Sequence, residues 1–348
     1  MSDTPPEPPP TPRLGTPPVG PAAGSAVPSP QPASQPAPQP TPGAPATPAA
    51  LAETKTAPGV DLDATPRPGP SPVQSSATTP PPAQTNGSHP VQAVISDVHG
   101  NMEALRAVLA DIRTQNVDEI VCLGDVVGYG PDPIDCLHLV RRVVKWSLCG
   151  NHDAAMFMAH GAVGFRESAA KAVAWQRRMM MPGFFSLPGK VARWRWLENL
   201  PASKQQGRVT YVHASPRDPL MEYVLEEDFQ NLGFGPSDKA LDMFERFDWL
   251  CFVGHSHRPG VATHDFKWVK PHELDNMTYY LPPNRKTLVN IGAVGQPRDQ
   301  NPDACYVIFD GVKIRYRRVK YDVATTQRKI RAVPELEPIL ADRLAKGM

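Results

Sequence analysis

Five short clusters of aspartate, histidine and asparagine stand out, because each directly follows a short run of apolar residues. They read DVHGN at 97–101, GD at 124–125, GNHD at 150–153, HAS at 213–215 and GHSH at 254–257. Five of the ten histidines of the chain fall in these clusters. Carboxylate, imidazole and amide groups together suit Mn²⁺, Fe, Zn²⁺ or Ni²⁺ better than Mg²⁺ or Ca²⁺, which prefer shells made only of oxygen. The clusters therefore predict a site for such metals.

The segments around the clusters predict strands that end at the polar residues. Apolar or β-branched runs predict strands at 91–96, 119–123, 145–149, 209–212 and 249–253. Helical spacing predicts helices at 101–114, 133–144 and 238–247. Further strands are expected at 261–266, 287–291, 304–309 and 313–320, with a helix over 325–345 that breaks at Pro334. The order is that of an α/β protein, whose site lies at the carboxyl ends of its strands.

The segment 154–206 differs from the rest of the folded part. It contains Trp175 and Trp194 among other aromatic and methionine residues, and Pro182 and Pro188 act as breakers. It predicts two or more helices and a loop that form a cap beside the site. Packing in the core is the alternative role for its large apolar side chains.

The first 90 residues predict a disordered tail. They hold 27 of the 43 prolines, with alanine, serine, threonine and glutamine between them. Such a segment buries too little apolar surface to offset the entropy of ordering it, and part of it should adopt polyproline II. Its PxxP spacings would suit an SH3-like groove, or the tail is a solvated spacer. Residues 91–348 are predicted to form one domain.

Composition narrows the class of protein further. The net charge is +1 and the basic clusters are short, so no clear nucleic-acid patch is present. No apolar run is long enough for a membrane span, and the N-terminus lacks the pattern of a signal peptide. The five scattered cysteines are expected as small core residues in a reduced compartment. A cytoplasmic protein with no membrane partner is the expectation.

The order D-x-H, G-D, G-N-H-D, H and G-H-x-H resembles that of the calcineurin-like metallophosphoesterase superfamily. The segments HASPRDP from His213 and GAVGQPRD from Gly292 are similar to its bacterial small-enzyme branch, which includes phosphodiesterases and diadenosine-tetraphosphatase-like proteins. The resemblance covers about 91–321 and departs from the usual pattern at Ala214 and in a longer segment around 182–190. It implies a four-layer αββα sandwich, in which two mixed sheets are flanked by helices.

The resemblance also implies two divalent metal ions, with Mn²⁺ favoured. One ion would be held by Asp97, His99, Asp125 and His257. The other would be held by Asp125, Asn151, His213 and His255. A hydroxide between the ions would attack phosphorus, and Asp125 would bridge them. His152 would face the phosphate and act as a catalytic residue, by donating a proton to the leaving oxygen or by stabilising the transition state.

Several roles stay open at the level of sequence. Asp153 either orients His152 or caps the following helix. Arg217 and Arg298 are candidates for binding substrate phosphate, but each precedes an aspartate, so a structural ion pair or turn is the alternative. The run Gly-Tyr-Gly at 128–130 predicts a turn near the metals, where Tyr129 could stack on a base.

The predicted activity is hydrolysis of a small phosphorylated substrate. A phosphatase would bind a monoester and a phosphodiesterase a diester, and the motifs do not separate the two. The alternative is a catalytically weak or inactive protein of the same fold that serves as a binding module or scaffold. Such a protein would be expected to lack metal ligands, and none is lost here.

Overall fold

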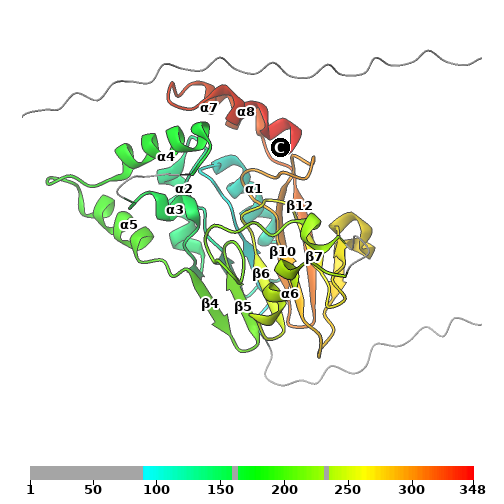
Figure 1. The fold of residues 1–348 in the computed structure, drawn as a ribbon. Helices are drawn as coiled ribbons and strands as arrows, with labels where there is room; N and C mark the ends of the chain where they lie inside the picture. Colours follow the sequence, from blue (N-terminus) through cyan, green and yellow to red (C-terminus); the bar gives the residue numbers. More distant parts are fainter. Residues whose placement is uncertain (1–88, 159–163, 231–234) are drawn as a thin grey trace, which may run out of the picture. The chain divides into compact units, whose positions relative to one another are not determined.

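A computed structural model describes residues 89–158, 164–230 and 235–348 (Figure 1). Two predictions concern the proline-rich tail, namely its disorder and its role in binding a partner. Residues 1–88 of this tail lie outside the described part. The described chain forms two six-stranded sheets, with helices against their outer faces (Figure 1).

The first sheet carries the early motifs. Its strands, in spatial order, are β3 (Trp146–Ser147), β2 (Glu119–Cys122), β1 (Gln92–Ile95), β11 (Ala304–Phe309), β12 (Lys313–Val319) and β9 (Thr278–Tyr280). Strands β1, β2 and β3 are parallel, whereas β11 pairs antiparallel with β1. The carboxyl ends of the three parallel strands therefore open at the same edge.

The second sheet carries the later motifs. Its strands, in spatial order, are β4 (Ser203–Gln206), β5 (Val209–Val212), β6 (Leu250–Val253), β10 (Thr287–Asn290), β7 (Gly260–Ala262) and β8 (Trp268–Val269). Strands β5, β6 and β10 are parallel, and β7 turns back against β10. This sheet is also mixed.

The two sheets face each other across an apolar core. Side chains such as Val94 and Val307 of the first sheet pack with Phe252 and Val289 of the second. Buried hydroxyl groups link the layers as well, because Tyr316 donates to the carbonyl oxygen of Asn290 at 2.8 Å.

Helices complete the outer layers. They are α1 (Met102–Ile112), α2 (Pro133–Val143), α3 (Asn151–Ala155), α4 (Glu167–Met180), α5 (Pro188–Glu198), α6 (Asp238–Glu245), α7 (Val323–Arg331) and α8 (Pro338–Asp342), with single 3₁₀ turns at Glu226–Phe229, Pro271–Glu273, Asp275–Met277 and Leu344–Lys346. Helices α1 and α2 pack on the first sheet, and α6 packs on the second (Figure 1). The predicted four-layer sandwich is confirmed. Among the described residues, no helix combines the length and apolarity that crossing a membrane requires.

The segment predicted as a cap, 154–206, contains two helices, α4 and α5, and ends in a strand. Residues 203–206 form β4 and pair antiparallel with β5 through a hairpin at Gly207. The polar sequence Ser-Lys-Gln-Gln hides this edge strand, because its alternating exposure leaves no apolar signal. Trp175 is buried against α7 and α8, whereas Phe184 and Phe185 are 96% and 94% exposed at the tip between α4 and α5.

Other boundaries differ from the sequence expectation by a few residues. The third strand is only Trp146–Ser147, and the strand expected at 261–266 is shortened to Gly260–Ala262 before a turn. The break expected at Pro334 is present, because α7 ends at Arg331 and α8 begins at Pro338. The short strands β8 and β9 were not predicted.

A charged contact anchors α1 on the first sheet. Arg317 of β12 donates two hydrogen bonds to Asp111, at 3.0 and 2.6 Å, and the Tyr306 hydroxyl donates a third at 2.7 Å. Partial burial opposes ionisation of this carboxyl, yet the hydrogen bonds from Arg317 hold the pKa of Asp111 below its usual value. The contact therefore stabilises the fold at neutral pH, and the contribution disappears as pH falls through the lowered pKa.

Asp111→Asn should lower the free energy of unfolding by about 1 kcal/mol at pH 7, after allowance for solvent screening at this partly exposed position. The difference from wild type should shrink below about pH 4, where the unfolded carboxyl is already protonated. Urea unfolding at pH 7 and below about pH 4 measures this difference in the free energy of unfolding. Asp248→Asn, in an exposed pair with Arg208, is the control and should have little effect. A difference that does not change with pH would refute the ionic origin.

Candidate metal centre

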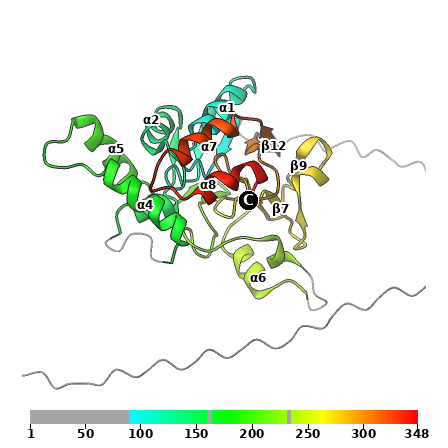
Figure 2. The same cartoon turned by 90° about the horizontal axis from the view of Figure 1, so that it is seen from above.

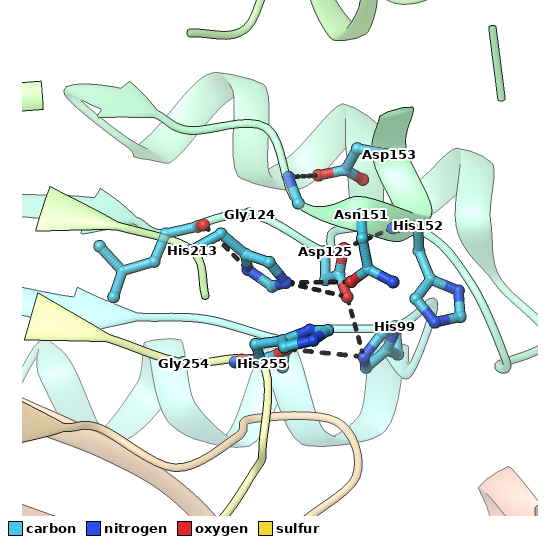
Figure 3. Close-up of polar contacts among 12 residues, drawn as sticks. His99, Gly124, Asp125, Asn151, His152, Asp153, His213, Gly254 and His255 are labelled. Atoms are coloured by element: carbon cyan, nitrogen blue, oxygen red, sulfur yellow. Dashed lines mark hydrogen bonds and ion pairs between the residues drawn. The ribbon is translucent and has the colours of Figure 1, made fainter. Parts of the chain in front are cut away.

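All seven predicted ligands converge at the carboxyl ends of strands from both sheets. Asp97 and His99 follow β1, Asp125 follows β2, Asn151 opens α3 after β3, His213 follows β5, and His255 and His257 follow β6. Every one of these side chains is buried. The prediction that the five clusters meet at one place is thus matched by their positions (Figure 3).

Backbone hydrogen bonds join the loops that carry these residues. The amide of Asp97 donates to the carbonyl oxygen of Gly124 at 3.0 Å, and the amide of Gly254 donates to that of His213 at 2.8 Å. The two sheets are linked where the amide of His255 donates to Asp97 Oδ2 at 3.1 Å. The loops therefore fix one another and hold the side chains in place.

The first group of donors consists of Asp97, His99 and His257. The Nδ1–H groups of the two histidines donate to the carbonyl oxygens of Val127 at 3.0 Å and Gln296 at 2.6 Å. Their Nε2 atoms, 3.1 Å apart, are therefore both acceptors when the rings are neutral. Asp97 Oδ1 lies 3.1 Å from His257 Nε2 and 3.7 Å from His99 Nε2.

The second group gathers around Asp125. His213 Nδ1–H donates to the carbonyl oxygen of Leu123 at 3.2 Å, which turns Nε2 toward the centre. His213 Nε2 lies 3.3 Å from Asp125 Oδ2 and 3.2 Å from Asn151 Oδ1. Carboxylate, imidazole and amide groups therefore face the same point.

His255 joins the second group in the opposite orientation. Its Nε2–H donates to the carbonyl oxygen of Met221 at 3.1 Å, so Nδ1 is the nitrogen left for the centre. The Tyr223 ring stacks on this imidazole at 4.2 Å and 18°. All four candidate histidine ligands thus have one ring nitrogen fixed by a backbone carbonyl, as is usual for histidines that bind metal.

Asp125 lies between the two groups. Its Oδ1 accepts the backbone amide of His152 at 2.8 Å, while its Oδ2 is 3.6 Å from His99 Nε2 and 3.3 Å from His213 Nε2 (Figure 3). One oxygen therefore holds the loop, and the other faces both groups of donors. This is the geometry expected of a bridging carboxylate.

Burial and charge set the protonation of these residues. Burial would raise the pKa of Asp125, but the neighbouring His213, His152 and His99 together outweigh burial and keep the carboxyl ionised. Burial alone would lower the pKa of His213, yet the charge of Asp125 raises it to about 9. Burial and His213 lower the pKa of His255 to about 4, and burial and Arg298 lower that of His257 to about 3. His255 and His257 are therefore neutral at pH 7.

This set of donors fits divalent metal ions. Within the described residues, the buried Asp97 Oδ1 accepts no hydrogen bond, although acceptors surround it. Facing lone pairs of nitrogen and oxygen repel each other unless a cation or a proton lies between them. Metal binding would displace the proton that His213 shares with Asp125.

His152 differs from the four candidate ligands. Its ring packs against Tyr129 at 4.4 Å, Phe165 at 4.7 Å and His99 at 4.8 Å. Its buried Nδ1 has no hydrogen-bond partner within the described residues, so no carbonyl fixes this ring. Burial holds the pKa of His152 well below its usual range. The neutral imidazole lies close enough to His99 and Asp125 to act on a group bound at the centre.

Asp153 contacts backbone rather than the His152 ring. Its Oδ1 accepts the amides of Val126 and Val127 at 3.1 and 3.2 Å, and its Oδ2 accepts the amide of Gly150 at 3.1 Å. Of the two roles left open by the sequence, the structure shows the cap. Asp153 also ties the loop after β2 to the start of α3.

The two arginine candidates have different surroundings. Arg217 pairs with Asp242 at 3.1 Å and Glu222 at 3.6 Å, so carboxylates already compensate its charge. Arg298 donates to Gln296 Oε1 at 3.0 Å and to the Tyr129 hydroxyl at 3.3 Å, and it forms no ion pair within the described residues. Asp299 pairs with Arg318 instead. Of these two arginines, Arg298 is the one that keeps its charge available beside the centre.

Several features of the site were not anticipated from sequence. Most of the predicted ligands adopt a left-handed backbone, which residues other than glycine rarely do. They are Asp97, His99, Asp125, His255 and His257, with φ between 48° and 60°. Phe165 and Tyr223, which cover His152 and His255, lie in segments without any motif.

The position of His152 depends on Gly128. A Cβ at Gly128, where φ is +98°, would lie 2.4 Å from His152 Nδ1. Gly128→Ala should therefore displace the ring and lower kcat up to about 10²-fold, since a shift of about 1 Å can have that effect. Steady-state kinetics with metal analysis measures it. Gly207→Ala, at an open turn with φ of +57°, is the control. An unchanged kcat in Gly128→Ala would argue against a role for His152.

Comparison with known proteins also bears on the assignment of these residues as a metal centre. The family model described as calcineurin-like phosphoesterase matches residues 92–264. An uncharacterized protein from Methanocaldococcus jannaschii is 35% identical over 262 residues, which cover 73% of this chain and 97% of the relative. The crystal structure of a metallophosphoesterase from Sphaerobacter thermophilus is 35% identical and superposes with a TM-score of 0.61, over 75% of this chain and 100% of that one.

A more distant structure shares the fold. It is that of a hypothetical protein from Pyrococcus horikoshii, which is 16% identical and has a TM-score of 0.56 over 74% of this chain and 98% of that one. The identity to the first two relatives, over nearly their full lengths, extends well beyond the motifs. The chain belongs to the calcineurin-like phosphoesterases, metal-dependent hydrolases that act on phosphoric esters.

Proposed function

We propose that this chain hydrolyses phosphate ester bonds of small phosphorylated molecules at a centre of two divalent ions. Mn²⁺ is the favoured metal, and Fe, Zn²⁺ or Ni²⁺ are alternatives. One observation carries the proposal: Asp125 Oδ2 lies between two groups of buried acceptors, 3.6 Å from one histidine and 3.3 Å from the other. Two ions bound there would neutralise phosphate oxygens and lower the pKa of a water enough to supply a hydroxide nucleophile.

Each of the two ions would be bound by its own group of side chains. Asp97, His99 and His257 would hold one ion, and Asn151, His213 and His255 would hold the other, with Asp125 shared between them. The backbone carbonyls behind the four histidines keep the correct nitrogen facing inward. The centre is thus preorganised, and little reorganisation is needed when the phosphate binds.

His152 would act on the leaving group. Its ring lies beside His99 and Asp125, and its neutral form still carries one N–H that can donate to an ester or phosphate oxygen. An anionic phosphate nearby would raise the pKa of this imidazole and favour proton transfer to the leaving oxygen. Phe165, which precedes α4, packs on the ring and supports a role for the inserted helices as a cap.

The cellular setting is also part of the proposal. All five cysteines are free thiols, and four of them are buried. Thiols of this kind are typical of reducing compartments, which favours the cytoplasm.

The test compares p-nitrophenyl phosphate with bis(p-nitrophenyl) phosphate, using the full chain with added Mn²⁺. We expect release of p-nitrophenol that a chelator abolishes and Mn²⁺ restores, and the ratio of the two rates decides between monoester and diester. If neither these esters nor a wider panel is hydrolysed with any of the four metals, the alternative of a binding module or scaffold is supported instead.

A further inference from the structure

Two arginines from distant parts of the chain meet at one tyrosine beside the centre. The guanidinium carbons of Arg298 and Arg343 lie 5.6 and 5.9 Å from the centroid of the Tyr129 ring. Arg298 follows β10, whereas Arg343 follows α8 near the end of the chain. Tyr129 in turn packs against the rings of His152 at 4.4 Å and His99 at 4.6 Å.

Apolar packing places Arg343. Leu340 and Leu344, on either side of it, are buried in a cluster with Trp175 of α4, and Tyr129 packs against the same cluster. Figure 2 shows α8 beside α4. The helical segment at the end of the chain is therefore fixed on the inserted helices, and its arginine is held next to Tyr129.

No aspartate or glutamate side chain neutralises the charge of this pair. Within the described residues, Arg298 and Arg343 form no ion pair with either residue type, and Arg343 donates to a main-chain oxygen of Met348, the last residue of the chain. Burial, followed by the charge of Arg298, lowers the pKa of Arg343 to about 10. Arg166 adds a third positive charge nearby.

The contrast with other arginines is informative. Arg217, Arg317, Arg318 and Arg331 all face carboxylates. Holding two guanidinium groups together in a partly buried place is unfavourable unless an anion binds between them. Arg298 Nε is buried and has no acceptor within the described residues, so it has hydrogen-bonding capacity to offer.

We propose that Tyr129, Arg298 and Arg343 form a subsite for a second phosphate group of the substrate. The preferred substrates would then be small molecules with two phosphate groups, one hydrolysed at the centre and the other held by the arginines. This inference rests on the proposed function, because the centre must bind the first phosphate. The two places are neighbours, because the Tyr129 ring that contacts both arginines also packs against the rings of His152 and His99.

Calorimetry on the metal-loaded full chain tests the subsite without turnover. The probes are propylphosphonate and propane-1,3-diphosphonate, which differ by one phosphonate and resist hydrolysis. Wild type should bind the diphosphonate about tenfold more tightly or better, since a charge-assisted arginine contact is worth at least that factor. Arg343→Gln should bring the ratio of the two dissociation constants close to one, and Arg343→Lys should keep part of it.

The control is Arg331→Gln on α7, whose arginine pairs with Asp342 and should leave the ratio as in wild type. Arg298→Gln is a second variant, for use if Arg343→Gln does not fold, and it should also lower the ratio. Equal binding of the two probes by wild type, or a ratio that survives both glutamine variants, would overturn the subsite.

The p-nitrophenyl ester assay runs in parallel. If the protein is hydrolytically active but the ratio of the two dissociation constants is near one, only the subsite is disproved. If the protein is inactive but this ratio is high, only the proposed function is disproved.

Discussion

Asp125→Asn should abolish metal-dependent ester hydrolysis, with kcat reduced roughly 10³-fold or more, because even the loss of an outer partner of a metal ligand costs about 10- to 100-fold. The change keeps the shape of the side chain and leaves Oδ1 able to accept the amide of His152. It removes the negative charge that faces both groups of donors, so the mutual repulsion of two adjacent cations would no longer be offset. The metal content should fall below that of wild type.

Circular dichroism and thermal unfolding should show that the variant is folded, and elemental analysis should show the loss of metal. Asp135→Asn, at an exposed position in the first turn of α2, is the matched control and should keep full activity and metal. Normal turnover by Asp125→Asn would reject the bridging role.

His152→Ala should lower kcat by about 10²- to 10⁴-fold, the usual range for a general acid or base. The metal content should stay at the wild-type value, because no backbone carbonyl orients this ring as a ligand. The loss should be larger for an alkyl phosphate than for p-nitrophenyl phosphate, since a poor leaving group depends more on proton donation.

His138→Ala, an exposed histidine on α2, is the control for this change. If metal is lost together with activity in His152→Ala, then His152 is a ligand, an arrangement that its closeness to His99 and Asp125 would allow. An equal effect on good and poor leaving groups would argue for a role in positioning the phosphate instead.

The meeting of the five clusters could be predicted from sequence, whereas the assignment of ligands to two ions came from the resemblance and stays a prediction. Each motif follows an apolar run, and parallel strands bring such ends to one edge of a sheet. Asp97 and Asp125 come from neighbouring parallel strands, so their meeting follows directly from the strand prediction. The four-layer arrangement followed from the resemblance, since periodicity alone does not say how two sheets stack.

The rest of the site depends on contacts that no local pattern encodes. The carbonyls of Val127 and Gln296 orient histidines, but any residue could supply a carbonyl there. Arg217 pairs with Asp242, which is distant in sequence, rather than with the aspartate that follows it. Arg343 reaches Tyr129 only because α8 packs on α4, a tertiary contact between helices far apart in the chain.

The metal stoichiometry of the full chain tests the central claim most directly. Protein stripped with a chelator would be reloaded with Mn²⁺, washed free of unbound metal, and examined by elemental analysis and electron paramagnetic resonance. The proposed site predicts two ions per chain with the signal of a coupled pair, since bridged ions lie about 3.5–4 Å apart. A single uncoupled ion per chain, or ester hydrolysis that persists without metal, would contradict it.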